Sequence, residues 1–144
     1  MEVQNYGNHR RFVKAYHVAL GGILLLTLFG SMVNLYQSLG DHQRQYSASL
    51  IVVIMITMCM IAFFSRMFPL KAQDRAIRAE ENLRHYVLTG KLLDPRVTTR
   101  QVVGLRFAPD EEFVDLAQKA AEENLSEDEI KKAVKNWRAD NYRV

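Results

Sequence analysis

Two long apolar stretches dominate the first half of this chain. They cover residues 15–36 and 48–64, contain no Asp, Glu, Lys or Arg, and are separated by a short polar loop. A helix needs about 20 apolar residues to cross the roughly 30 Å hydrocarbon core of a bilayer. We therefore expect an all-α membrane protein whose residues 1–68 form a two-helix transmembrane hairpin, with spans at about 15–36 and 48–67. Residues 69–144 should form a cytosolic helical extension followed by a small helical bundle.

The composition after the second stretch argues against nucleic acid as a ligand. From Asp110 onward there are ten acidic and six basic residues, although the whole chain carries a formal charge of +3. An acidic surface repels phosphate backbones. Cys59 is the single cysteine, so the chain has no pair for an intrachain disulfide.

Basic residues flank the two apolar stretches on their outer sides. The loop between the stretches contains only Arg44, which is balanced by Asp41. The flanking bases are Arg10, Arg11 and Lys14 before the first stretch, and Arg66, Lys71, Arg75, Arg78 and Arg84 after the second. Because bases concentrate on the side that is not translocated, the N- and C-termini of this multi-pass chain should both be cytoplasmic.

Small residues recur at helical spacing in the first stretch. They are Ala15, Ala19, Gly22, Thr27 and Ser31. Small faces allow close approach of helices, so this face predicts contact with the second span or with a partner protein; ordinary helix composition explains it equally well. The hydroxyl groups of Thr27 and Ser31 can bond to the preceding helical turn.

Pro69 predicts a kink or a helix boundary, because proline disfavours helical geometry in the residue before it. A further helix should run to about Leu88 and stop at Gly90. Its apolar positions alternate in spacing between four and three residues and form a packing seam, defined as Ala72, Ala76, Ala79, Leu83 and Tyr86. Asp74 with Arg78, and Glu80 with Arg84, have the spacing of ion pairs on a solvated helix.

Three bases of this helix form a basic stripe, defined as Lys71, Arg75 and Arg78. Close to an anionic membrane surface, each base contributes about 1 kcal/mol of attraction, so the stripe is a candidate contact for anionic lipid. The alternative is a topology signal on a solvated helix face.

The C-terminal part predicts three short helices. Thr98 or Thr99 can cap the first, Pro109 opens the second, and Ser126 with Glu129 forms a capping box for the third. The apolar face of the last helix should consist of Ile130, Ala133, Val134 and Trp137. We expect the last two helices to pair, with Trp137 filling the core of the bundle.

No arrangement of reactive residues indicates an enzyme, a metal site or a cofactor. His9, His17, His42 and His85 are dispersed and lack the spacing of metal ligands. No phosphate-binding loop, nucleophile elbow or dinucleotide-binding motif occurs in the sequence.

Several polar pieces resemble a known family over essentially the whole chain. They are Gln4-Asn5-Tyr6 with Asn8-His9, the run from Leu70 to Arg78, Leu105-Arg106-Phe107-Ala108, Ile130 to Ala133, and Trp137 to Asp140. The chain is similar to a family of small bacterial two-span membrane proteins of unknown function, from Bacteroidota-like genomes. The resemblance implies location in the bacterial inner membrane and gives no activity, cofactor or catalytic residue.

These observations favour a non-enzymatic, membrane-anchored adaptor or accessory subunit of an inner-membrane assembly. Its partners would be the bilayer and a protein, either another protein or further copies of the chain, bound through the spans and the seam. The alternative is a sensor or modulator that binds anionic lipid through the basic stripe. A third hypothesis, an enzyme on a lipid-like substrate, requires a cytoplasmic pocket with convergent titratable groups.

Overall fold

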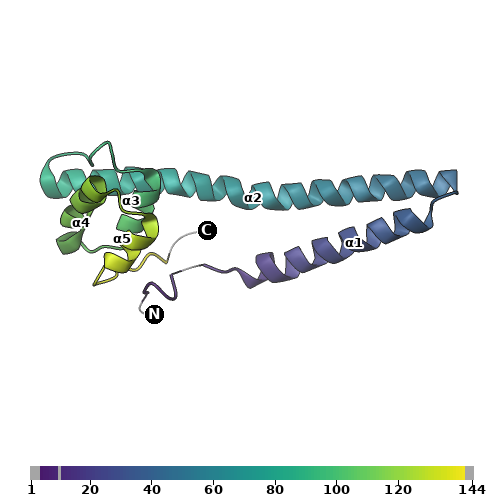
Figure 1. Ribbon diagram of the computed structural model, residues 1–144, viewed down its shortest axis with the longest axis horizontal. Helices are drawn as coiled ribbons and strands as arrows, with labels where there is room; N and C mark the ends of the chain where they lie inside the picture. The colour runs from purple at the N-terminus through teal and green to yellow at the C-terminus, as the bar shows by residue number, and fades with distance from the viewer. Residues whose placement is uncertain (1–3, 10, 142–144) are drawn as a thin grey trace. The chain divides into compact units, whose positions relative to one another are not determined.

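The computed structural model describes residues 4–9 and 11–141, and these residues contain helices and no strands. The helices are η1 (Ala15–Leu20, a π-helical segment), α1 (Gly21–Gln37), α2 (His42–Thr89), α3 (Thr99–Leu105), α4 (Asp110–Glu123) and α5 (Glu127–Ala133) (Figure 1). The predicted all-helical fold is therefore correct.

The contacts of the chain divide it into two units. The hairpin unit is Phe12–Phe68, and the helical unit combines the described residues before Phe12 with those from Pro69 onward. Helix α2 contributes to both units. The two units meet between Phe68 and Pro69, the position at which the sequence analysis divides the chain. The N-terminal segment, residues 4–9, groups with the helical unit and not with the hairpin.

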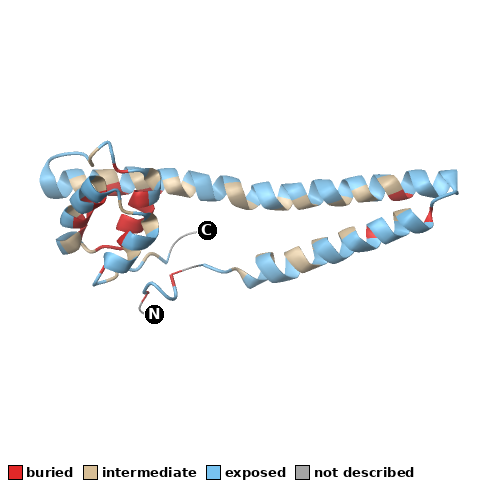
Figure 2. Cartoon of the chain, in the orientation of Figure 1, coloured by how far each residue is buried: buried red, intermediate tan, exposed pale blue. Residues whose placement is uncertain are grey.

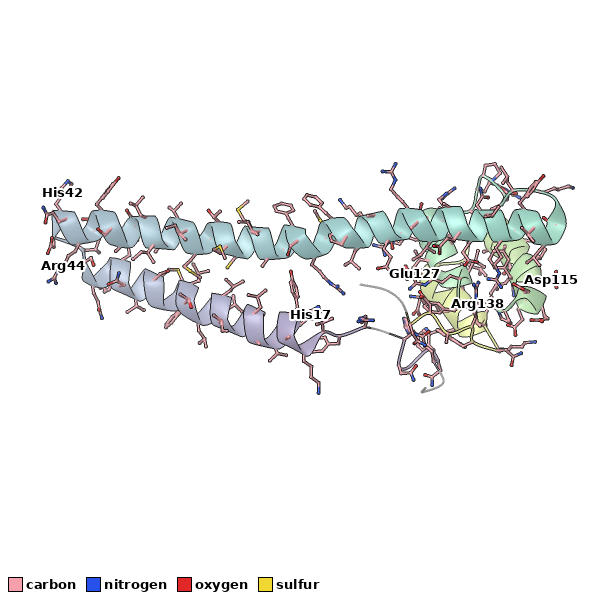
Figure 3. The ribbon with its side chains drawn as sticks, turned by 180° about the vertical axis from the view of Figure 1, so that it is seen from behind. His17, His42, Arg44, Asp115, Glu127 and Arg138 are labelled. Atoms are coloured by element: carbon pink, nitrogen blue, oxygen red, sulfur yellow. The ribbon has the colours of Figure 1, made fainter. Side chains whose placement is uncertain are left out.

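In the hairpin unit, α1 and the first part of α2 run antiparallel (Figure 1). His42 and Arg44 lie at the start of α2, directly after the turn between the two helices (Figure 3). The less exposed positions repeat at intervals of four and three residues, which is the pattern of two helices packed along a heptad seam. The positions that follow this repeat are Leu24, Leu28, Ser31 and Leu35 on α1, and Ala48, Val52, Met55, Cys59 and Ala62 on α2; Gly21, Gly22, Ser49, Arg66 and Met67 are also half-buried.

The first helix is attached to α2 near its own start as well. The Tyr16 hydroxyl donates a hydrogen bond to the carbonyl oxygen of Ala62 and lies 3.3 Å from the Ser65 hydroxyl. The other faces of the hairpin are apolar and exposed (Figure 2). In the most apolar 18-residue window of each long helix, only 6% of the residues are buried. By length and composition both helices could cross a membrane.

The predicted small face of the first stretch is only partly used within the hairpin. Ser31 is buried and Gly22 half-buried, whereas Ala15, Ala19 and Thr27 are exposed. The Thr27 and Ser31 hydroxyls donate to the carbonyl oxygens of Ile23 and Leu28 at 2.8 and 2.7 Å, as predicted.

Helix α2 continues through Pro69, so of the two expected outcomes, a kink or a helix boundary, the boundary is wrong. Proline has no amide proton, which leaves the carbonyl of Ser65 without its usual donor four residues on. The helix tolerates this loss because its other turns remain bonded, and it ends at Thr89, followed by Gly90 with a positive φ of 73° as predicted.

The helical unit has a single core centred on α3. All residues from Gln101 to Ala108 are buried, and the fully buried side chains include Leu105, Phe107 and Phe113. Helices α4 and α5 pack on α3, and Ile77 of α2 joins the same core. Figure 2 shows that burial concentrates in this unit.

Local capping signals fix the ends of the short helices. Thr98 and Ser126 each form a complete capping box, with Gln101 and Glu129 respectively. Asn124 ends α4 in the left-handed conformation, with a φ of 51°.

The last helix differs from its prediction in two respects. It ends at Ala133, so Val134 and Trp137 lie beyond it, and it packs chiefly on α3 and less on α4. Glu112 stops the helix from continuing, because its carboxylate accepts the backbone N–H groups of Lys135 and Asn136 at 2.9 and 3.0 Å. Trp137 packs against the core from this extended tail.

Gly104 and Gln101 of α3 allow α5 and α4 to pack closely against it. A Cβ atom on Gly104 would lie 3.0 Å from the carbonyl oxygen of Glu127 and 3.1 Å from Ile130 Cγ2, so α5 approaches α3 where a side chain is absent. The buried Gln101 amide donates to the carbonyl oxygens of Ala120 and Leu125 at 3.0 and 2.9 Å. It thereby satisfies acceptors at the C-terminal end of α4.

Candidate functional site

The predicted seam of α2 lies on the outside of the helical unit. Ala72, Ala76, Ala79, Leu83 and Tyr86 are all exposed. The side of α2 that packs on α3 and α4 is the opposite one and includes Ile77, Glu81 and Arg84. The seam is therefore not used for packing within the helical unit, and it remains a prediction for contact with another chain.

The packed side of α2 is held by buried charges. Arg84 Nη1 lies 2.9 Å from Glu81 Oε2, and its other guanidinium nitrogens bond to Asp110 at 2.5 to 2.6 Å and to the carbonyl oxygen of Ala108 at 2.9 Å. The guanidinium also stacks 4.3 Å from the centre of the Phe113 ring. The Glu81 side chain is only 6% exposed, so Arg84 neutralises a buried carboxylate.

The ion pairs expected from sequence spacing do not form. Arg84 pairs with Glu81 and Asp110 and not with Glu80. The Glu81 carboxylate is buried, so leaving it unpaired would cost more free energy than leaving the exposed Glu80 unpaired. Arg78 donates to the Thr99 hydroxyl at 3.1 Å instead of pairing with Asp74.

Two of the three bases in the basic stripe, Lys71 and Arg75, have no bonded partner among the described residues. Lys71 and Arg75 are exposed, and within residues 4–9 and 11–141 neither forms a hydrogen bond or an ion pair. Arg78 is half-buried and engaged with Thr99. The stripe therefore offers Lys71 and Arg75 to an external anion.

A polar cleft of about 230 Å³ lies between α2, the end of α3 and the C-terminal tail. Arg106 is 8% exposed, and its guanidinium lies 3.3 Å from Asp140 and 4.6 Å from the centre of the Phe107 ring. Burial lowers the pKa of Arg106 from its usual value, and Asp140 opposes that shift. Arg106 Nε and Gln73 Oε1 are buried without a hydrogen-bond partner among the described residues. Arg138 lies 3.4 Å from Glu81, so most charges of the cleft neutralise one another.

The N-terminal segment docks on this same unit. The Tyr6 hydroxyl donates to Asp128 at 2.5 Å, and the Gln4 side-chain oxygen accepts the backbone N–H of Asp140 at 2.8 Å. The His9 ring is buried, with centroids 5.8 Å from Phe107 and 5.7 Å from Trp137. Three of the pieces that carried the family resemblance therefore meet around Phe107.

Sequence reasoning missed this cluster. Residues 4–9 have no helical or strand periodicity, and their partners are more than 90 positions away. The available signal was compositional: an unusual run of Asn, Tyr, Gly and His ahead of an apolar span. Within this run Asn5 forms a tight turn. Its side-chain oxygen accepts the backbone N–H of Gly7 at 2.8 Å, and its own backbone N–H donates to the side-chain oxygen of Asn8 at 2.6 Å.

Within the described ranges, no group of three or more His, Cys, Asp or Glu side chains is arranged to hold a metal ion. The four histidines remain dispersed: His17 belongs to η1, His42 begins α2, His85 bonds to the carbonyl oxygen of Lys91, and His9 lies in the aromatic cluster.

The fold and these surfaces define a class: an all-helical protein that joins an exposed apolar hairpin to a compact helical unit. Comparison with protein families is consistent with the resemblance seen in the sequence. The chain belongs to a family of unknown function, DUF6526, whose model matches residues 1–144. No curated protein and no solved structure matches the chain.

Proposed function

We propose that this protein is a non-enzymatic adaptor or accessory subunit anchored in the bacterial inner membrane. The hairpin unit would cross the bilayer twice and hold the helical unit at the cytoplasmic face, where that unit binds a partner protein. The observation that carries the proposal is the difference between the two units. The hairpin unit has an exposed apolar surface, whereas the helical unit has a buried hydrophobic core of its own.

The exposure of the hairpin supports a membrane location. Core helices of a soluble protein can be equally long and apolar, but they are mostly buried, whereas only 6% of each apolar window is buried here. Each Å² of apolar surface removed from water contributes roughly 25 cal/mol. Lipid would cover the side chains that the hairpin leaves exposed, and both helices bond their backbone internally, apart from the bond that Pro69 cannot donate to Ser65.

The docking of the N-terminal segment supports a shared location of both chain ends. Residues 4–9 precede the first apolar helix and the rest of the helical unit follows the second, yet Tyr6 bonds to Asp128 and Gln4 to Asp140. Such contacts support placing both flanks of the hairpin on one side of the membrane. The basic residues that flank the hairpin favour the cytoplasm as this side.

The surface of the helical unit supports a binding role. Its buried charges are paired within the chain, as Arg84 is with Glu81, whereas its apolar seam on α2 is exposed. Exposed apolar patches on an otherwise well-packed domain mark interaction sites.

The proposal can be tested by crosslinking cells, extracting the full chain in mild detergent and identifying the proteins that purify with it. We expect one specific protein in near-stoichiometric amount. A Phe113→Asp variant is the control, because it disrupts the core of the helical unit and leaves the hairpin intact; it should lose the partner. A chain that purifies alone, or a partner that is kept by the control, would contradict the adaptor role.

A second candidate function is binding of anionic lipid through Lys71 and Arg75. The observation that favours it is their exposure, with no partner in the described chain, directly after the apolar part of α2. In bilayer discs that mix neutral and anionic lipids, Lys71→Glu with Arg75→Glu should abolish enrichment of anionic lipid around the protein. The control is Lys119→Glu on α4, and unchanged enrichment in the double variant would eliminate this function.

A further inference from the structure

The exposed seam of α2 has the geometry of one strand of a two-stranded coiled coil. We propose that it pairs with the same seam of a second copy, in parallel, over residues 72–86. This inference rests on the proposed function, because a hairpin that crosses the membrane gives every copy of α2 the same direction. It makes the adaptor a symmetric dimer with two helical units.

The seam positions follow a heptad repeat. With Ala76 and Leu83 at a positions, the d positions are Ala72, Ala79 and Tyr86. The packed residues Ile77, Glu81 and Arg84 lie away from the seam, and Ala76 at its edge also lines the polar cleft. Leu83 and Tyr86 are 63% and 52% exposed, and the alanines toward Pro69 would let the two backbones approach closely.

Two charges beside the seam select a second copy in the parallel direction. Arg75 precedes the a position Ala76 and is a g residue, and Glu80 follows the d position Ala79 and is an e residue. In a parallel coiled coil, a g residue faces the e residue five positions further along the partner helix. Arg75 therefore faces Glu80 of the other copy, and the symmetry of the dimer forms this pair twice.

The same two residues have no bonded partner in the described part of the chain, although Glu80 also lines the polar cleft. Among the described residues, neither Arg75 nor Glu80 forms a hydrogen bond or an ion pair, and both are exposed. In an antiparallel pairing centred on Ala79, the two Glu80 side chains would face each other, which is repulsive. The parallel arrangement instead places each of these charges opposite one of the other sign.

The seam is short, about two heptads, so it should associate weakly in free solution. Anchoring in a membrane confines the copies to two dimensions with a common direction, which raises their effective concentration. We therefore expect dimers in the membrane and dissociation on dilution into detergent.

Cysteine crosslinking tests the direction of pairing. In full-length chains with Cys59→Ala, Ala72→Cys and Tyr86→Cys are made separately and treated in membranes with a short bis-maleimide. Both variants should form dimers with themselves, because each d residue meets its own counterpart in a parallel coil. Asp115→Cys on α4, exposed at the surface of the helical unit (Figure 3), is the control for random collision. Crosslinking only between mixed Ala72→Cys and Tyr86→Cys chains would indicate an antiparallel pair and overturn the proposal, as would crosslinking no greater than that of the control.

Charge exchange tests the proposed ion pairs. Arg75→Glu alone, or Glu80→Arg alone, places like charges opposite each other twice, and should weaken dimerisation about tenfold. The double variant Arg75→Glu with Glu80→Arg should restore it. Because both residues are exposed, the fold should persist in all three variants. Failure of the double variant to recover would refute the pairing. Loss of dimers while a different protein still co-purifies would refute this inference and leave the adaptor role intact.

Discussion

The Tyr6 hydroxyl donates a hydrogen bond of 2.5 Å to the carboxylate of Asp128, which lies 122 positions later in the chain. This bond connects the segment before the hairpin to the helix that follows it. Lys132 and Tyr6 together lower the pKa of Asp128. The bond thus joins two parts of the helical unit that the hairpin separates in the sequence.

Tyr6→Phe should loosen the N-terminal segment. The variant removes one hydrogen bond to a carboxylate, and it should reduce protection of the backbone amides of residues 4–9 about fivefold. Hydrogen exchange followed by mass spectrometry measures this. Tyr36→Phe in α1 is the control, since Tyr36 is exposed. Equal protection in Tyr6→Phe and wild type would mean that the bond does not hold the segment.

Arg84→Met should destabilise the helical unit strongly. It leaves the buried Glu81 with only Arg138 at 3.4 Å, and breaking a buried ion pair in this way costs about 3 kcal/mol. Thermal unfolding followed by the fluorescence of Trp137, the single tryptophan, would report the change. Arg75→Met on the exposed side of α2 is the matched control and should change stability by about 0.5 kcal/mol or less. Comparable effects of the two variants would exclude the predicted role of Arg84.

Gly104→Ala should lower stability, although alanine is the better helix former. The new methyl group would lie 3.0 Å from the Glu127 carbonyl oxygen, so α5 must move away from α3, at a cost of about 1–3 kcal/mol. Urea unfolding of the full chain in detergent measures this free energy. Helix propensity alone predicts a gain of up to about 1 kcal/mol, so an increase in stability would rule out the close contact.

The capping and turn signals of the helical unit could be predicted from sequence because they are local. Thr98, Ser126 and Gly90 act within a few residues of themselves, and the structure confirms each. The packing side of α2 could not be predicted in the same way. Its apolar residues gather on the exposed seam, whereas the packed side includes Glu81 and Arg84, whose charges cancel only after the chain folds. Hydropathy therefore does not reveal which side of α2 packs within the chain, and the seam stays a prediction for contact with another chain.

The other differences also depend on non-local contacts. Periodicity predicted that α5 would reach Trp137, but Glu112 binds the backbone of Lys135 and Asn136 and holds the tail in an extended form. The interactions of residues 4–9 form with positions beyond 100 and leave no periodic pattern in the sequence. Pro69 carries a strong local signal for a helix boundary, and the continuous helix α2 overrides it.

Acid should release the C-terminal tail. Hydrogen bonds from the backbone of Lys135 and Asn136 lower the pKa of Glu112, so its stabilising effect is present above its unfolded pKa of about 4.3 and is lost as the pH falls through the lower, folded value. Between pH 6 and pH 3, Trp137 emission should shift as the tail opens. Glu112→Gln should remove part of this pH dependence, whereas Glu111→Gln, at an exposed position, should not. Identical titrations of wild type and Glu112→Gln would contradict the assignment.

The proposed adaptor role requires a hairpin that crosses the membrane and returns, with its loop outside the cytoplasm and the helical unit inside it. In chains with Cys59→Ala, a cysteine at Gln43 in the first turn of α2 and another at Asp115 on α4 can be exposed separately to a membrane-impermeant maleimide in intact cells. We predict that Gln43→Cys reacts in intact cells and that Asp115→Cys reacts only after lysis. Reaction of both before lysis would contradict a cytoplasmic helical unit, and reaction of Asp115→Cys alone would invert the topology.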